Sequence, residues 1–367
     1  MLNKRNETID IAKAIAIFAI VLGHVSSGLL WDFTLYFATA GFFLFSGLTF
    51  YLDSSHEGQL LWRKEESFFA FLKKSLARIL FPYALWGIIS IIVYTAFGYI
   101  SNPADFKGNE TYSIMKNLLG LLYGNSDGGF FEWNRPLWFL PCLFMVELIA
   151  FTILKCTEKN HKLQLAACIT TIATSLAWLF FVDRSGSGTF VWPFELETAL
   201  AMLSFFMTGV LIRKKMLSLS MNTAVKRIIC IAVCFVLWTL IILLVLKRGG
   251  SDTRSDLYRG FPQYIYATTT GIAGILLLSA ALTGGRGTGW LTYIGKRTLP
   301  ILVMHKFPIM LCKIVFPWLS QKIAEGSILV EIMFAIMIVA VTLLIEKILS
   351  VIAPWAFGLK PKKYKIF

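Results

Sequence analysis

Long apolar segments separated by polar loops recur along the whole chain. Each segment is close to the roughly 20 residues that a helix needs to cross the hydrocarbon core of a bilayer. The pattern predicts ten membrane-spanning helices, near residues 9–30, 34–52, 79–99, 137–155, 163–182, 194–212, 228–246, 262–283, 298–318 and 328–350. We therefore expect an all-α integral membrane bundle of about ten transmembrane helices, forming a single membrane-embedded domain over residues 1–367.

The two longest polar stretches cover residues 53–77 and 100–135. Neither is long enough for a soluble catalytic domain, so any chemistry must take place within the bundle or at its edges. In the second stretch, residues 112–123 have apolar side chains at helical spacing. This spacing predicts an amphipathic helix that lies along the membrane interface.

Composition agrees with a membrane protein, and the distribution of charge orients it. Hydrophobic residues make up 57% of the chain and the mean hydropathy is +0.69. Only 15% of residues are charged, against about a quarter in soluble domains. The net charge of +14 falls in short Lys and Arg clusters between apolar segments, which indicates membrane orientation and not a nucleic-acid partner. Loops on the side of the two termini hold more than twice as many of these residues, so both termini are expected to be cytoplasmic.

The six Cys residues lie mostly within or at the ends of apolar segments and show no CxxC spacing. A buried Cys usually behaves as a small hydrophobic residue, so we expect neither disulfides nor a metal site. The first apolar segment is too long for a cleavable signal peptide, and no small-residue cleavage site follows it. We expect this segment to be retained as the first span.

The first predicted span carries Lys13 and His24. Ionisable side chains within a span cost roughly 3 kcal/mol or more and commonly mark function. Eleven residues of separation is within about 20° of three full turns, so both side chains project from one face, roughly 16 Å apart along the axis. We expect Lys13 near the cytoplasmic boundary, where Asp10 can pair with it, and His24 just beyond mid-membrane.

Each of these two residues has a structural interpretation beside the functional one. An imidazole titrates near neutral pH and can take a proton from a hydroxyl group, as a general base does. A buried histidine can equally hold helices together through hydrogen bonds. Lys13 lies close enough to the end of the span for its ammonium group to reach the lipid headgroups without any catalytic role.

Other spans carry further candidates. His305 lies about eight residues into the ninth span, where Pro308 breaks the helical hydrogen-bond ladder and frees backbone carbonyl groups. Glu147, in the fourth span, needs a partner there. Both residues could bind substrate or could serve packing and ion pairing alone. Trp138 begins the fourth span, where a tryptophan is commonly an interfacial anchor.

A basic cluster precedes the third span, with Lys73, Lys74 and Arg78 close together. These side chains could hold the phosphates of an anionic cytosolic cofactor, Arg78 through paired hydrogen bonds. The alternative interpretation is that they only anchor the loop at the cytoplasmic surface.

These segments together resemble acyltransferase family 3, the bacterial membrane acyltransferases that include sugar O-acetyltransferases. The most specific part is Lys13, ten intervening residues and His24, in a span that reads DIAKAIAIFAIVLGH. The supporting segments are GFFLFSG at 41–47, ARILFPY at 77–83, PLWFLPCLF at 136–144 and VMHKFPI at 303–309. Their order and spacing extend the similarity over nearly the whole chain.

The resemblance implies acyl transfer across the bacterial cytoplasmic membrane. The donor would be cytosolic acyl-coenzyme A, most often acetyl-coenzyme A in the family, and the acceptor a hydroxyl group of an extracytoplasmic or lipid-linked carbohydrate. It implies that His24 and Lys13 are the catalytic residues, with His24 as the general base and Lys13 nearer the donor. It also implies donor phosphates near Arg78, Lys73, Lys74 and Arg297, and an acceptor side shaped by His305 and Trp138.

The chain departs from the family pattern at two points. Many members have Arg at the position of Lys13, so a bidentate contact cannot be carried over. Larger members have paired acidic residues soon after the tryptophan of the fourth span, where this chain has Leu143 and Phe144. A fused extracytoplasmic hydrolase-like domain, present in some relatives, is not expected here. A transporter or exporter is the alternative function, in which midplane His and Glu residues form a proton relay or substrate site.

Overall fold

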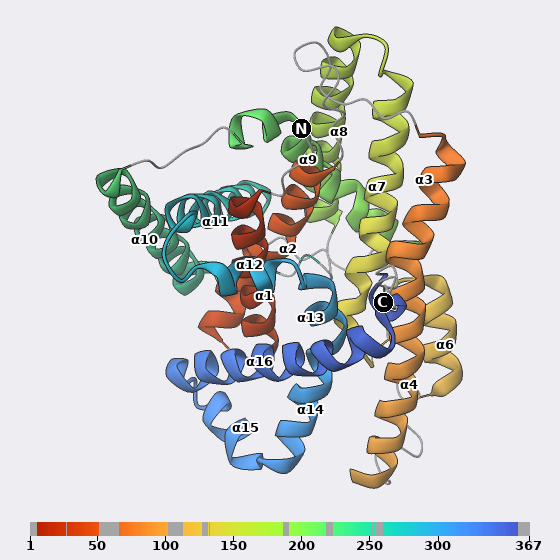
Figure 1. Ribbon diagram of the computed structural model, residues 1–367, viewed down its shortest axis with the longest axis vertical. Coiled ribbons are helices and arrows are strands. Elements are labelled where there is room, and N and C mark those ends of the chain that lie inside the picture. The colour runs from red at the N-terminus through yellow and green to blue at the C-terminus, as the bar shows by residue number, and fades with distance from the viewer. Residues whose placement is uncertain are drawn as a thin grey trace, which may run out of the picture.

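The computed structural model describes residues 6–26, 28–50, 66–101, 113–126, 131, 133–185, 191–217, 223–251, 253 and 260–358. Within these residues the chain is built of helices and contains no β-strand (Figure 1). Apolar segments become helices because a backbone in lipid must satisfy its hydrogen bonds internally, and a helix does so within one segment. The predicted all-α membrane fold is confirmed.

Nine helical segments of the described chain are long and apolar enough to cross a membrane. Eight are single helices: α1 (Glu7–Val25), α2 (Leu29–Thr49), α7 (Phe139–Cys156), α8 (His161–Ser185), α9 (Leu196–Leu217), α10 (Ala224–Arg248), α11 (Phe261–Leu282) and α16 (Ile328–Ile352). The ninth joins α3 (Phe68–Ser75), the π-helical turn η2 (Leu76–Leu80) and α4 (Phe81–Ser101). A tenth is broken into α13 (Thr298–Met304) and α14 (Lys306–Val315), bent by 42°. With this pair counted as one span, the ten predicted spans are found and the chain is a multi-pass membrane protein.

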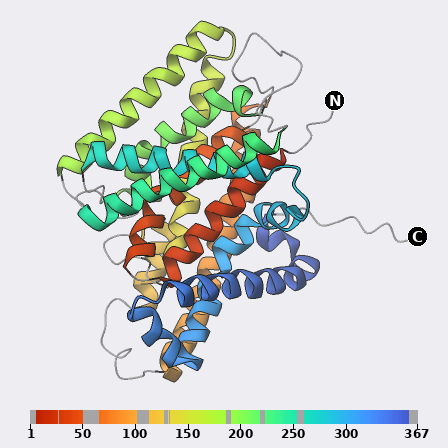
Figure 2. The same ribbon diagram turned by 90° about the vertical axis from the view of Figure 1, so that its left-hand side faces the viewer.

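Shorter elements connect and cover the spans. They are the helices α6 (Ile114–Tyr123), α12 (Gly289–Gly295) and α15 (Pro317–Ala324), and the single turns η4 (Arg135–Trp138), η5 (Pro193–Glu195) and η6 (Pro354–Phe357). Figures 1 and 2 show α1 and α2, in red, at the centre of the bundle. They lie between the pair α10 and α11 on one side and α3 and α4 on the other, with α14 to α16 along one edge.

Two of the predicted boundaries that were wrong change the position of a candidate residue. α1 ends at Val25 instead of near 30, because Ser26 leaves the helical conformation, with φ −87° and ψ 165°, and caps the helix. Gly28, with a positive φ of 69° that glycine tolerates, then precedes α2. His24 therefore lies in the last turn of α1, and its depth in the membrane stays a prediction. The third span begins at Phe68 instead of 79, so Arg78 lies inside a continuous helical segment and not where a loop meets a helix.

The sequence predicts which helix ends share a side of the membrane, and two such pairs of ends are in contact in the structure. Near the start of α1, Thr8 hydrogen-bonds Thr283 just after α11, with 2.9 Å between the two Oγ1 atoms. At the opposite ends, the carboxylate of Asp183 in α8 accepts hydrogen bonds from the backbone N–H groups of Gly260 and Phe261. The up-and-down alternation of these spans agrees with the prediction, while the cytoplasmic side rests on the charge bias alone.

α6 corresponds to the amphipathic helix predicted near residues 112–123. It lies beside α4 (Figure 1), where the Tyr83 hydroxyl donates a hydrogen bond of 2.9 Å to the carbonyl of Leu121. Gly87 lets the side chain of Leu121 approach the α4 backbone. The helix is thus packed on the first turns of α4, and its position at the membrane interface stays a prediction.

α2 and α9 approach each other through two glycines. Gly47 of α2 lies against the carbonyl group of Phe206, and Gly209 of α9 lies against that of Leu44. An added methyl group at either glycine would overlap the backbone of the other helix. Small residues allow membrane helices to pack in this way, and the contact fixes the position of α2 beside α9.

Candidate active site

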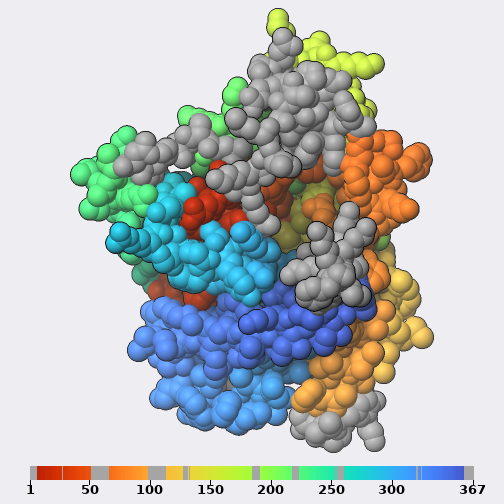
Figure 3. Space-filling model, in the orientation of Figure 1, coloured from red at the N-terminus to blue at the C-terminus, as the bar shows by residue number. Residues whose placement is uncertain are grey.

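A large cavity of about 1620 Å³ lies between α1, α2, α3, η2, α7, α13 and α16, and η6 forms part of its wall. In Figure 3, α1 and α2, in red, are visible in a hollow between the blue-cyan region of α12 and the orange α3. Small-molecule sites commonly measure roughly 300–1,000 Å³. This cavity therefore has room for a ligand larger than a typical metabolite.

Six basic side chains line the cavity, against two carboxylates, which leaves four positive charges in excess among the lining residues. One of the six, Lys74, also forms an ion pair with Glu66, which is not part of the lining. The basic residues are Lys13, Lys73, Lys74, Arg78, Lys296 and Arg297, and the acidic ones are Glu147 and Glu346. The structure thus brings together six of the nine site residues that the sequence predicted. The described residues contain no group of three His, Cys, Asp or Glu side chains placed to hold a metal ion.

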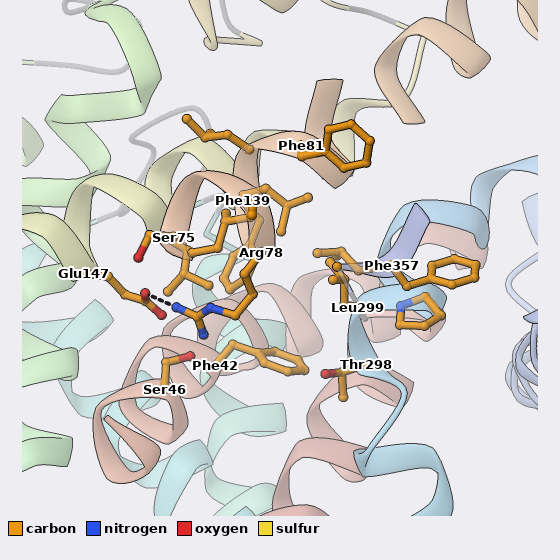
Figure 4. Close-up of a pocket in the computed structure, with 18 of the residues that line it drawn as sticks. Phe42, Ser46, Ser75, Arg78, Phe81, Phe139, Glu147, Thr298, Leu299 and Phe357 are labelled. Atoms are coloured by element: carbon orange, nitrogen blue, oxygen red, sulfur yellow. Dashed lines mark hydrogen bonds and ion pairs between the residues drawn. The ribbon is translucent and has the colours of Figure 1, made fainter. Parts of the chain in front are cut away.

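Arg78 and Glu147 form an ion pair on one wall of the cavity (Figure 4). Arg78 projects from η2, the π-helical turn that joins α3 to α4, and such turns often occur at functional sites. Glu147 lies halfway along α7 and its side chain is only 5% exposed, so the partner that the sequence required is Arg78. The carboxylate holds the guanidinium group in place while 55% of the arginine side chain stays exposed.

A second arginine of the cavity lining is held in the same way. Arg297 Nε donates a hydrogen bond of 2.9 Å to the carboxylate of Glu346, whose side chain is 3% exposed. Its guanidinium carbon lies 3.6 Å from the ring centroid of Tyr293, as in a cation–π contact. The next residue, Thr298, lies across the cavity from Arg78 in Figure 4. Two guanidinium groups that line the cavity are thus each held by a buried carboxylate.

One stripe of α1 runs from this cavity towards the histidines. Lys13, Ile17 and Ile20 line the cavity at helical spacing, and His24 is the next residue of the same stripe. Lys13 Nζ donates a hydrogen bond of 3.2 Å to Oγ1 of Thr49 at the end of α2. The shared face that the sequence predicted for Lys13 and His24 is present, with Lys13 inside the cavity and His24 beyond its end.

The two candidate histidines form a stacked pair. The ring centroids of His24 and His305 lie 5.2 Å apart, with 29° between their planes. Trp31 of α2 meets the His24 ring edge-on, with 6.1 Å between centroids. The sequence suggested neither contact, because each joins residues of different helices.

The backbone determines the tautomer of His305. This residue is completely buried at the break between α13 and α14, and its Nδ1 lies 2.9 Å from the carbonyl oxygens of both Ile301 and Leu302. A carbonyl oxygen only accepts hydrogen bonds, so Nδ1 carries the proton and a neutral ring leaves Nε2 as an acceptor. No described residue donates a hydrogen bond to this Nε2.

Three predicted site residues, His24, His305 and Trp138, lie outside the cavity wall. The wall nevertheless reaches within one helical turn of both histidines, because Leu302 lines it three residues before His305. Trp138 is buried in η4, which packs against α13, and its ring contacts Phe139. It is part of the packed interior on the His305 side of the bundle.

The sequence pattern did not indicate three polar residues of this region as site residues. Glu346 could have been found, because a carboxylate in an apolar span needs a partner. Lys296 belongs to a loop whose basic residues indicated only the orientation in the membrane. Asn134 precedes η4 and is fully buried, and its Nδ2 donates to Ser90 Oγ at 3.1 Å and to the Val303 carbonyl at 3.0 Å. Nothing in its sequence context separates it from an ordinary loop asparagine.

Comparison with known families assigns the class of chemistry. A family model described as an acyltransferase domain matches residues 6–347, from the start of α1 into the last turns of α16. The chain belongs to acyltransferase family 3. The resemblance carried by the sequence motifs is thereby confirmed, and this family 3 protein is a multi-pass membrane acyltransferase. No curated protein and no solved structure matches the chain.

Proposed function

We propose that this acyltransferase moves an acyl group, acetyl in the simplest case, from cytosolic acyl-coenzyme A to a hydroxyl group of an extracytoplasmic or lipid-linked carbohydrate. The observation that carries the proposal is the position of the histidine pair, one helical turn beyond a cationic cavity. A donor bound in that cavity has its reactive end beside His24. The protein would act in the bacterial cytoplasmic membrane, where it would modify polysaccharides of the cell envelope.

The charge of the cavity suits the phosphates of coenzyme A. This molecule carries about four negative charges at neutral pH, because a phosphate monoester has its second pKa near 6. Arg78 and Arg297 present guanidinium groups already oriented by buried carboxylates, which favours paired contacts with phosphate oxygens. Lys73 and Lys296 are exposed at the cavity edge and would attract an anionic donor. Lys74 is exposed there too and would do so while paired with Glu66.

The inner wall of the cavity suits the uncharged arm of the donor. Ile17, Ile20, Phe42 and Leu143 give this part an apolar surface. The arm and its thioester carry no formal charge, so their removal from water costs far less than that of the phosphates. Lys13 lies about 16 Å along α1 from His24, so we assign it to donor binding and not to the proton transfer.

His24 provides the base that the reaction requires. As the acceptor oxygen attacks the thioester carbonyl carbon, the imidazole takes the hydroxyl proton and a new C–O bond forms. The tetrahedral intermediate then collapses, the C–S bond breaks, and the imidazolium returns its proton to the leaving thiolate. The products are an ester and free coenzyme A, with His24 neutral again. A positioned base of this kind typically contributes about 10²–10⁴-fold to the rate.

The proposal is tested with purified His24→Ala protein and radiolabelled acetyl-coenzyme A. We expect label transfer to a carbohydrate acceptor to fall at least about 10²-fold while binding of acetyl-coenzyme A stays unchanged. His161→Ala is the matched control, because His161 is exposed at the start of α8, far from the pair in sequence, and should transfer normally. Near-normal transfer by His24→Ala would contradict the general-base role.

A further inference from the structure

We propose that the acceptor carbohydrate binds through its hydroxyl groups to Tyr94, Asn134 and His305, here called the acceptor cluster. These residues come from α4, from the segment before η4 and from the α13–α14 break. The inference rests on the proposed function, because it names the residues that would hold the acceptor of that reaction. The sequence motifs single out neither Tyr94 nor Asn134.

The hydrogen bonds of Asn134 determine which way its amide points. The Val303 carbonyl only accepts, so the nitrogen of the amide must face it. The same Nδ2 donates to Ser90 Oγ, which is free to accept because its own proton goes to the Trp86 carbonyl at 2.6 Å. Both amide hydrogens are therefore used, while Oδ1 is buried and accepts from no described residue. The side chain is thus held in one orientation, and its Oδ1 can still accept a hydrogen bond.

His305 and Tyr94 repeat this arrangement. The ring of His305 is held by two backbone carbonyls through Nδ1, which directs Nε2 away from α13 as a second bare acceptor. The hydroxyl oxygen of Tyr94 is buried as well and has no hydrogen-bond partner among the described residues. A buried polar atom without a partner costs stability, so three of them in one region indicate groups that a ligand satisfies.

Aromatic rings pack around the Tyr94 member of the cluster. Tyr94 packs against Trp133 and Phe307, with centroid distances of 5.6 Å and 5.9 Å. Phe307 in turn packs against Trp86 at 6.0 Å. Binding sites for small neutral molecules combine such apolar walls with a few fixed polar groups. Flat rings beside the apolar faces of a sugar, with acceptors for its hydroxyl groups, fit a carbohydrate.

The chemistry of the cluster also sets the class of ligand. Asn134 Oδ1 and His305 Nε2 accept hydrogen bonds and cannot donate them in the states described, so neither atom can hydrogen-bond a carboxylate or phosphate oxygen. Hydroxyl groups donate and therefore match both atoms. The cluster also adjoins the proposed reaction centre, because the ring of His305 stacks on that of His24. A sugar held here would present a further hydroxyl to the base.

The most selective test compares two Tyr→Phe variants of the same helix. Tyr94→Phe removes a hydroxyl with no described partner, so we expect an unchanged or raised Tm and a KM for the acceptor raised about 5- to 10-fold. Tyr83→Phe removes a hydroxyl that is satisfied by Leu121, so we expect a lower Tm and an unchanged acceptor KM. The KM for acetyl-coenzyme A should stay constant in both variants.

A second pair of variants separates the two nitrogens of His305. His305→Asn keeps a donor near the Nδ1 position and loses the acceptor, whereas His305→Gln places an oxygen near the Nε2 position. We expect the acceptor KM to rise about tenfold for the Asn variant and less for the Gln variant. If His305 only holds the helix break together, the Asn variant is instead the better of the two, and its acceptor KM stays normal.

The acceptor probes are methyl and octyl glycosides of glucose, galactose, mannose and N-acetylglucosamine, with 1-propanol as the single-hydroxyl control. We expect transfer to at least one glycoside far above transfer to 1-propanol. If the wild-type protein acylates a glycoside but Tyr94→Phe and His305→Asn leave its KM unchanged, the acceptor cluster is refuted and the proposed function stands. If the wild-type protein binds acetyl-coenzyme A but acylates none of the probes, the proposed function fails and the acceptor cluster fails with it.

Discussion

The ion pair between Arg78 and Glu147 should respond asymmetrically to mutation, because its two members differ in exposure. The side chain of Glu147 is 5% exposed in the middle of α7, whereas that of Arg78 is 55% exposed. Arg78→Gln leaves the carboxylate buried without its cation, and removing one partner of a buried pair costs about 3–5 kcal/mol. Glu147→Gln lets the guanidinium turn to water in the cavity and keeps a neutral acceptor. We expect that loss to be only about 1–2 kcal/mol, the difference between a charge-assisted and a neutral hydrogen bond.

Thermal unfolding of the purified variants in one detergent measures this order. We expect the apparent Tm to fall more for Arg78→Gln than for Glu147→Gln. The double variant should be more stable than Arg78→Gln alone, because the uncompensated carboxylate is gone. The pair of Arg297 and Glu346, with side chains 30% and 3% exposed, should show the same order. Equal losses in the two single variants, or additive losses in the double variant, would refute the reasoning.

Substitutions in other elements distinguish residues needed for helix packing from residues needed for binding or catalysis. Gly47→Ala should lower the yield of folded protein, because the added methyl group forces α2 away from α9. Gly41→Ala should be tolerated, because its methyl group meets only side chains at 3.5 Å or more. Size-exclusion chromatography of the two purified variants measures the difference. Lys296→Ala should weaken binding of acetyl-coenzyme A several-fold at low salt and less at high salt, because salt screens the charge. Titration calorimetry measures this affinity, and an unchanged affinity at low salt would argue against a phosphate site. Pro308→Ala restores a backbone donor and should straighten the 42° bend that places His305, so kcat should fall; full activity would show that the bend is dispensable.

The number and placement of the spans could be predicted because lipid imposes one strong rule on the sequence. A segment of about 20 apolar residues has few alternatives to a helix, so ten spans followed from hydropathy alone. The common face of Lys13 and His24 followed from helical periodicity, which depends only on local geometry. The turn at Gly28 was harder to predict, because the residues around it are apolar enough to continue a span.

Contacts between spans could not be predicted from the pattern. Glu147 was expected to need a partner, but only the folded bundle shows that Arg78 meets it from η2. The stacking of His24 on His305 likewise joins helices far apart in the sequence. The burial of Asn134 could not be predicted for another reason. A loop asparagine is normally solvated, and nothing in the local sequence indicates that this one is buried. Such positions are set by tertiary packing and not by local propensity.

Transfer of label across a sealed membrane tests the central claim most directly. Inside-out vesicles containing the protein, loaded with an acceptor glycoside and supplied externally with radiolabelled acetyl-coenzyme A, have the donor on the cytoplasmic face and the acceptor on the other. We predict labelled glycoside inside the wild-type vesicles and none in vesicles with His24→Ala. Labelled product only when donor and acceptor share one face, or glycoside flux that needs no acyl donor, would contradict transmembrane acyl transfer.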